Sequence, residues 1–205
     1  MTIELPSTTG FIKASNFYLE TNTQMFTSPI NKSVQTVQLS GARWRMDITL
    51  RMMKKADAAT WIAFFLKMRG MSETFYGFDP DWKVNRGSAS YAPGTPLVKG
   101  AGQTGTSLII DGCPANVTGY LKAGDYYTAG GELKRLTADV DTNGSGEATL
   151  VGEPYFRTSP ADNSAVTVAN PKAKMRLVDD SQLSWQSNQH GIYGEKTFSA
   201  FESIP

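Results

Sequence analysis

The sequence predicts a mainly β protein with one α-helix and a small inserted β barrel. Three observations lead to this prediction. Apolar and polar residues alternate over 43–52, the apolar period becomes helical from residue 57, and short β-prone segments separated by glycine-rich turns fill residues 106–178. The first two patterns define one domain, and the third defines another.

The strand expected over 44–52 carries its apolar side chains on one face. A period of two is that of a half-buried strand, so one face is expected to pack on a core. The apolar positions are Trp44, Met46, Ile48, Leu50 and Met52, and the opposite positions are Arg43, Arg45, Asp47, Thr49 and Arg51.

A helix is expected from Asp57, with Ala58, Trp61, Ile62, Phe65 and Met68 at helical spacing. Its ends fit this assignment: Asp57 lies near the start, Lys67 and Arg69 lie in the last turn, and Gly70 suits a left-handed cap. Phe64 lies off the main apolar stripe and is expected to be exposed, which indicates a protein contact. The aromatic segment 75–78 then predicts a second strand.

Two further segments are assigned to the first domain. Residues 1–42 are expected to be irregular with short strands, of which 34–41 is the clearest, and the aromatic segment 192–203 is expected to complete the domain. The first domain therefore comprises residues 1–85 together with 181–205, and 86–180 is an insertion.

The inserted domain is expected to be an OB-like small barrel, because it offers five or six short strands without a convincing helix. Its aromatic side chains suggest a ligand face made of Tyr126, Tyr127 and Tyr155. The expected strands are 106–112, 124–130, 132–140, 147–152, 165–169 and 173–178.

Charge and cysteine content exclude several classes. The chain has 205 residues with 20 basic and 19 acidic side chains, so its net charge of +1 gives no general reason to bind nucleic acid or an anionic membrane. Cys113 is the single cysteine, which excludes an intrachain disulfide. The first residues do not resemble a secretion signal, and no stretch is apolar enough to span a membrane, so we expect assembly in a cytoplasm.

Two glycine-containing motifs resemble ligand loops. GAGQTG (100–105) matches a dinucleotide-binding pattern, but a β segment follows it where that chemistry needs a helix, so we interpret it as a flexible domain junction. DVDTNG (139–144) resembles the start of a calcium loop, but Leu150 stands where the closing glutamate belongs, so a hairpin loop is expected.

No catalytic, cofactor-binding or metal-binding residues are predicted, and the chain is not expected to be an enzyme. His190 has no nucleophile motif beside it and is interpreted as a loop residue. The acid pairs 79/81 and 179/180 are typical of turns. Cys113 is interpreted as a small turn or core residue.

Arg43, Arg45 and Arg51 form the one local concentration of positive charge, with Lys54 and Lys55 following. This face could meet a polyanion. A solvated outer face, or ion pairs across a subunit contact, is favoured because Asp47 interrupts the row.

Two blocks of the chain resemble the distal tail protein (Dit) family of long non-contractile-tailed bacteriophages. The first block is VQTVQLSGARWRMDITLRMM (34–53) followed by ADAATWIAFFLKMRGMSETFYGF (56–78). The second, VKGAGQTGTSLIIDG (98–112) and the segment 121–168, is similar to the β domain that phage tail components carry as an insertion or appendage. Together the blocks cover about residues 30–180.

The resemblance implies a tail-tube-like β sandwich with a flanking α-helix and an OB-like domain outside it. It implies a structural protein of the virion tail that forms a homo-hexameric ring, with the tail tube on one face and the baseplate hub or tail tip on the other. Peripheral tail fibres are possible further partners, and DNA passes through the lumen without being read. In such a ring, Arg43, Arg45, Arg51 and Phe64 are expected at subunit interfaces.

Two other functions stay open. The chain could be another tail component, such as a tube or tube-terminator protein. It could also be an OB-like module that binds single-stranded nucleic acid or glycan, although few Lys or Arg residues accompany the candidate tyrosines.

Overall fold

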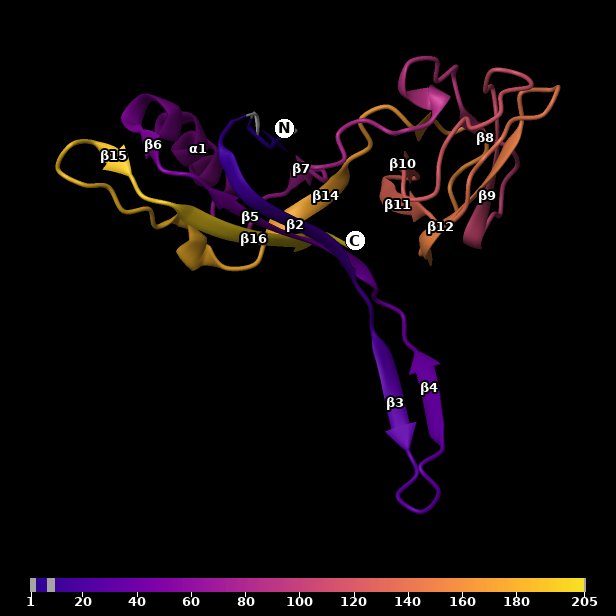
Figure 1. Cartoon of the computed structure of the whole chain (residues 1–205), viewed down its shortest axis with the longest axis horizontal. Helices are drawn as coiled ribbons and strands as arrows, with labels where there is room; N and C mark the ends of the chain where they lie inside the picture. The colour runs from indigo at the N-terminus through magenta and orange to yellow at the C-terminus, as the bar shows by residue number, and fades with distance from the viewer. Residues whose placement is uncertain (1–2, 7–9, 205) are drawn as a thin grey trace.

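The structure is a computed structural model that describes residues 3–6 and 10–204. In this part of the chain it contains one α-helix, two six-stranded sheets and two two-stranded sheets. Figure 1 shows the first sheet and the helix on one side, the second sheet on the other, and a hairpin that projects away from both. The expected fold class, mainly β with one helix, is confirmed.

The first sheet has the strand order β1-β7-β14-β16-β5-β2. Only β1 and β7 run parallel, and the other neighbours are antiparallel. The strands are β1 (Ile3–Glu4), β2 (Ile12–Glu20), β5 (Arg43–Leu50), β7 (Phe75–Gly77), β14 (Ala173–Leu177) and β16 (Lys196–Glu202). The helix α1 (Lys55–Met68) lies beside this sheet, and β6 (Met53–Lys54) pairs with β15 (Ile192–Tyr193).

The second sheet has the order β13-β10-β11-β12-β9-β8, with antiparallel neighbours throughout. An isolated bridge between Leu97 and Ala165 connects its two edges, so the sheet nearly closes into a barrel. Its strands are β8 (Leu97–Val98), β9 (Gly105–Asp111), β10 (Tyr126–Ala129), β11 (Glu132–Leu136), β12 (Ala148–Phe156) and β13 (Val166–Thr167). Short 3₁₀ helices lie at η1 (Ser88–Ser90) and η2 (Asp180–Leu183).

The strand β14 corrects the expected division of the chain. The sequence assigned 173–178 to the inserted barrel, but β14 lies in the first sheet between β7 and β16. Ala173, Met175 and Leu177 are fully buried there and belong to the same core as the helix. The chain therefore returns to the first sheet before residue 173.

The core of the first domain follows the expected alternation. Along β5 the side chains are buried at every second position from Trp44 to Leu50. The strand ends at Leu50, and beyond it Met52 is 63% exposed whereas Met53 is buried. The alternation is confirmed, and its extension to Met52 is wrong.

Phe64 is buried, so its expected exposure is wrong. Its ring packs edge-to-face against Phe75 of β7, with 5.2 Å between ring centres, and against Phe65. The buried face of α1 comprises Ala58, Trp61, Phe64, Phe65 and Met68. It is therefore shifted relative to the predicted stripe, because Phe64 is buried and Ile62 is only partly buried.

The end of α1 shows why a glycine follows it. Arg69 already adopts the left-handed conformation, with φ of 50°, and Gly70 follows with φ of 67°. A Cβ on Gly70 would overlap the carboxylate of Asp180, which accepts a hydrogen bond of 2.8 Å from the amide of Met71. Gly70 thus allows η2 to pack on the helix end.

The two glycine-containing motifs form turns. Residues 100–105 connect β8 to β9 within one antiparallel hairpin, so they are not a domain junction. The Gln103 side chain holds this loop by accepting from the amide of Ile109 at 2.6 Å. In the second motif, Asp141 accepts from the amide of Gly119 at 2.6 Å, and Asn143 caps the turn at 143–147.

Candidate interaction surfaces

The chain presents an isolated hairpin made of β3 (Thr23–Thr27) and β4 (Val34–Gln38). We call residues 23–38 the arm. It continues the ribbon that β2 and β5 form inside the first sheet, and Figure 1 shows it extending far beyond that sheet. Every residue of both arm strands is exposed.

The composition of the arm is unusual for an exposed strand pair. Lys32 is the single charged residue between positions 21 and 39. Exposed edge strands commonly carry charge to prevent pairing with other chains, and an isolated two-stranded hairpin is only marginally stable in water. The arm instead exposes apolar side chains at Met25 (66%), Phe26 (64%), Ile30 (94%), Val34 (54%) and Val37 (50%).

The tip of the arm is held by its own hydrogen bonds. The amide of Ser28 donates to the carbonyl of Ser33 at 2.8 Å, and the amide of Lys32 donates to the carbonyl of Ser28 at 3.0 Å. Asn31 accepts from both the amide and the hydroxyl of Ser33. This turn leaves Ile30 almost fully exposed at the end of the molecule.

The root of the arm is fixed where it meets the sheet. Asn22 donates from its side chain to the carbonyl of Ser40 at 3.0 Å, and Gly41 takes a φ of 108°, which side chains rarely allow. Arg157, from the second domain, donates to the carbonyl of Ala42. The arm therefore leaves the sheet from a defined position.

A buried ion pair joins this root to both domains. Arg157 contacts Glu202 of β16 at 2.8 Å, and Glu202 accepts from the amide of Trp44 at 3.2 Å. Trp44 in turn donates from its indole to the carbonyl of Leu133 in β11 at 2.8 Å. Tyr126 of β10 packs edge-to-face on Trp44, so the two sheets share one core at this junction.

The arginine face of β5 finds partners within the chain. Glu20 of β2 accepts from Arg43 at 2.8 Å and from Arg45 at 3.0 Å, and the Arg43 hydrogen bond is the main reason that the pKa of Glu20 lies below its usual value. Arg43 also lies over the ring of Phe201, and Arg51 lies over Phe11. A role for these arginines between subunits stays a prediction.

The predicted tyrosine ligand face does not form. Tyr126 is 2% exposed and Tyr127 is fully buried, because β10 lies between the two cores and packs on both sides. Burial raises the pKa of both phenols, and the hydroxyl of Tyr126 donates to Asp79 at 3.0 Å. Only Tyr155 of the three is partly exposed.

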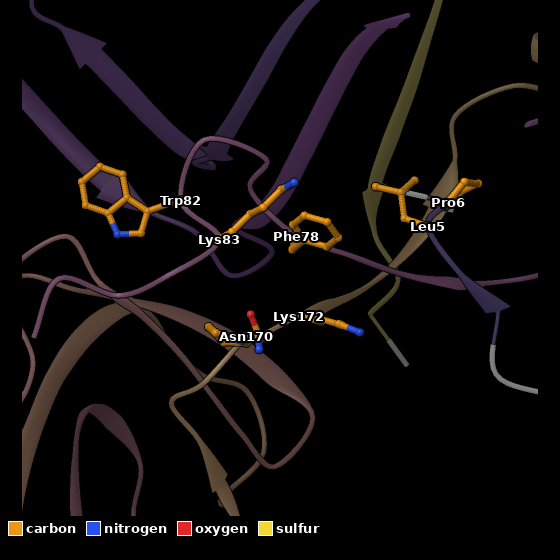
Figure 2. A pocket seen from close by; sticks show the side chains of 8 residues that line it. Leu5, Pro6, Phe78, Trp82, Lys83, Asn170 and Lys172 are labelled. Carbon is orange, nitrogen blue, oxygen red and sulfur yellow. The ribbon is translucent and has the colours of Figure 1, made fainter. Parts of the chain in front are cut away.

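A pocket of about 340 Å³ lies at the junction of the domains. Figure 2 shows that its side chains come from three segments: Leu5 and Pro6 after β1, Phe78 to Lys83 on the way to the second domain, and Asn170 to Lys172 on the return. This pocket was not predicted from the sequence. No local pattern indicates it, because the three segments are far apart in the chain.

The remaining candidates have structural roles or stay exposed. Asp79 accepts from the amide of Asp81, and Asp81 accepts from the hydroxyl of Ser15 at 3.1 Å. His190 is exposed in a loop, where its amide donates to the side chain of Asn188. Cys113 is buried in the barrel core, and burial raises the pKa of its thiol.

Among residues 3–6 and 10–204, no group of three His, Cys, Asp or Glu side chains could hold a metal ion. The helix in this described part of the chain is neither long nor apolar enough to cross a membrane.

No protein-family model matches the chain, and no curated protein matches it.

Proposed function

We propose that this chain is a structural protein of the phage virion, a distal tail ring subunit that joins the tail tube to the baseplate or tail-tip hub. In this proposal, copies of the chain form a homo-hexameric ring, and DNA passes through its lumen. The proposal rests on the sequence resemblance and on one structural observation, the exposed arm.

The arm supports assembly because its apolar side chains have no partner within the chain. Among the described residues of the two hydrophobic cores, none belongs to residues 23–38. Covering Phe26 and Ile30 would stabilise a complex by roughly 1.5–3 kcal/mol for each fully buried side chain. The arm is therefore suited to pack on another molecule.

The shape of the subunit favours a ring. The arm points away from both sheets (Figure 1), and in the proposed ring it packs on a different surface of the neighbouring copy. Such head-to-tail contacts generate closed rings when the rotation between copies closes. In such a homo-oligomer each contact joins two different surfaces, so no surface has to pair with a copy of itself.

The charge of the β5 outer face is compatible with this arrangement. Glu20 partly neutralises Arg43 and Arg45, so the net positive charge of this face is smaller than the sequence suggests. We place Arg43, Arg45 and Arg51 near a subunit contact rather than in the lumen.

Native mass spectrometry and negative-stain imaging of the purified chain test the proposal. We expect rings for the wild type, and monomers for Phe26→Asp and for a variant in which residues 24–37 are replaced by Asn-Gly. Tyr91→Asp is the matched control, because Tyr91 is 81% exposed in the second domain and lies outside the arm. Rings that persist without the arm would contradict this role.

A second measurement separates the proposal from the alternative binding module. We expect no salt-dependent binding of a single-stranded oligonucleotide, because Tyr126 and Tyr127 are buried. A wild-type chain that stays monomeric with purified tail tube but binds the oligonucleotide would favour the alternative.

A further inference from the structure

The pocket between the domains has a rigid aromatic wall. The indole of Trp82 donates a hydrogen bond to Asp125 at 3.3 Å. The guanidinium groups of Arg86 and Arg135 lie over the Trp82 ring, 4.9 and 5.0 Å from the ring centre. These contacts fix the orientation of the ring. Phe78 and Leu5 extend the apolar lining (Figure 2).

The buried carboxylate of Asp125 holds the segment that carries Trp82. Asp125 is fully buried and accepts from the amides of Arg86, Gly87 and Lys122 at 3.0, 3.1 and 2.8 Å. The outgoing segment is thus attached to the second domain just after the pocket. A site on this segment is preformed rather than assembled by the ligand.

The two lysines of the pocket differ in their partners. Lys172 is paired with Glu4 at 2.7 Å. Lys83 has no Asp or Glu oxygen within 4.0 Å among the residues that the structure describes, and its ammonium lies 5.9 Å from the centre of the Phe78 ring. Lys83 therefore places a positive charge without a carboxylate partner beside Phe78, whereas the guanidinium groups of Arg86 and Arg135 are held over Trp82.

We propose that this pocket binds a peptide segment of another protein, in which an aromatic or large aliphatic side chain lies next to a carboxylate. The apolar side chain packs on Trp82 and Phe78, and the carboxylate pairs with Lys83. The exposed amide of Asn170 at the rim is placed to hydrogen-bond the peptide backbone. The inference does not depend on the chain forming a ring.

The chemistry of the lining argues for a peptide over other ligands. A volume of about 340 Å³ is at the small end of ligand pockets, which suits one or two side chains. A sugar would need several neutral hydrogen-bonding groups, whereas Asn170 is the one neutral polar side chain among the described lining residues. Lys83 and the already paired Lys172 are the cations among the described lining residues, whereas a nucleic acid is held by a basic groove that follows its backbone.

Binding of small probes to the whole chain tests the inference. N-acetyl-phenylalanine carries the expected ring and carboxylate, and N-acetyl-phenylalanine amide has the same ring without the charge. We expect the carboxylate probe to bind roughly tenfold more tightly, because a charge-assisted hydrogen bond is the stronger kind. Binding is followed by NMR shifts of the Trp82 indole and Asn170 side-chain amide signals.

Two lysine variants test whether Lys83 supplies the positive charge that pairs with the carboxylate of the probe. Lys83→Gln is expected to bind both probes equally, whereas Lys54→Gln keeps the wild-type preference because Lys54 is an exposed lysine on β6, outside the pocket. The proposal would be overturned if the wild type bound both probes equally, or if neither probe shifted these signals at about 10 mM. It would also be overturned if maltose shifted the signals more than the probes do.

Discussion

The base and the arm of one β ribbon differ sharply in their surroundings. At the base, β5 lies between β2 and β16, and the side chains of Met46, Ile48 and Leu50 are fully buried. In the arm, β3 and β4 continue the same ribbon with no residue covered. The comparison shows that regular strand pairing alone does not give a β ribbon its stability, which depends on what its faces pack against.

The change between the two regions occurs within a few residues. Ala42 and Trp44 are buried and held by Arg157 and Glu202, whereas Gly41 and Ser40 are exposed. The base is therefore part of the folded core, and the arm is an exposed apolar hairpin, which we propose packs on another molecule.

The largest effect is expected for a core truncation at the base. Ile48→Ala should lower the free energy of unfolding by about 2–5 kcal/mol, because it leaves a cavity between the sheet and the helix. Val37→Ala in the arm is the control and should change it by less than about 0.5 kcal/mol. Urea unfolding of both variants in the Phe26→Asp background, which is expected to be monomeric, measures the two losses, and similar losses would contradict the comparison.

A smaller effect is expected at the root. Glu202→Ala should cost about 1–2 kcal/mol, because the guanidinium of Arg157, which is 17% exposed, loses its closest carboxylate but keeps Glu132 at 3.6 Å. Lys13, which forms an exposed pair with Glu195, provides the control, and Lys13→Ala should cost less than about 1 kcal/mol. Equal midpoints in urea for the two variants would show that the root contributes no more than an ordinary surface pair.

The smallest effect concerns the pH dependence of the base. Because the pKa of Glu20 is lowered, its contribution to stability is present above the usual glutamate pKa and is lost as the pH falls through the lowered value. Arg43→Gln should raise the pKa of Glu20 towards its usual value, since the Arg43 hydrogen bond is the largest cause of the shift.

Arg51→Gln is the control for this titration, because Arg51 lies over Phe11 and does not contact Glu20. Carboxyl NMR signals followed through the acid range give the Glu20 midpoint. A midpoint that does not move in Arg43→Gln would contradict the assigned ion pair.

The elements that could be predicted from the sequence are those in which buried residues recur at a regular spacing. The alternation of β5 and the helical spacing of α1 both follow from one face meeting a core, so both could be read locally. The strand at 34–41 was also predicted, but its exposure was not, because alternation does not reveal whether a face is covered.

The remaining features depend on contacts between distant segments. Tyr126 and Tyr127 look available in the sequence, and their burial arises only because β10 meets cores on both sides. Phe64 is buried because β7 supplies Phe75, and the short alternation of β14 fits either sheet. The pocket combines residues 5, 78–83 and 170–172, which no local pattern connects.

The neighbouring strands β7 and β14 mark the place in the first sheet where the second domain is inserted. They run antiparallel with Gly77 opposite Ala173, so the segment between them leaves and re-enters the first sheet at the same place. A two-residue turn is long enough to join such strands directly. Exchanging the inserted module would keep the strand order of the scaffold, and the replacement would have to supply new partners for Trp44 and Glu202, which now bind Leu133 and Arg157.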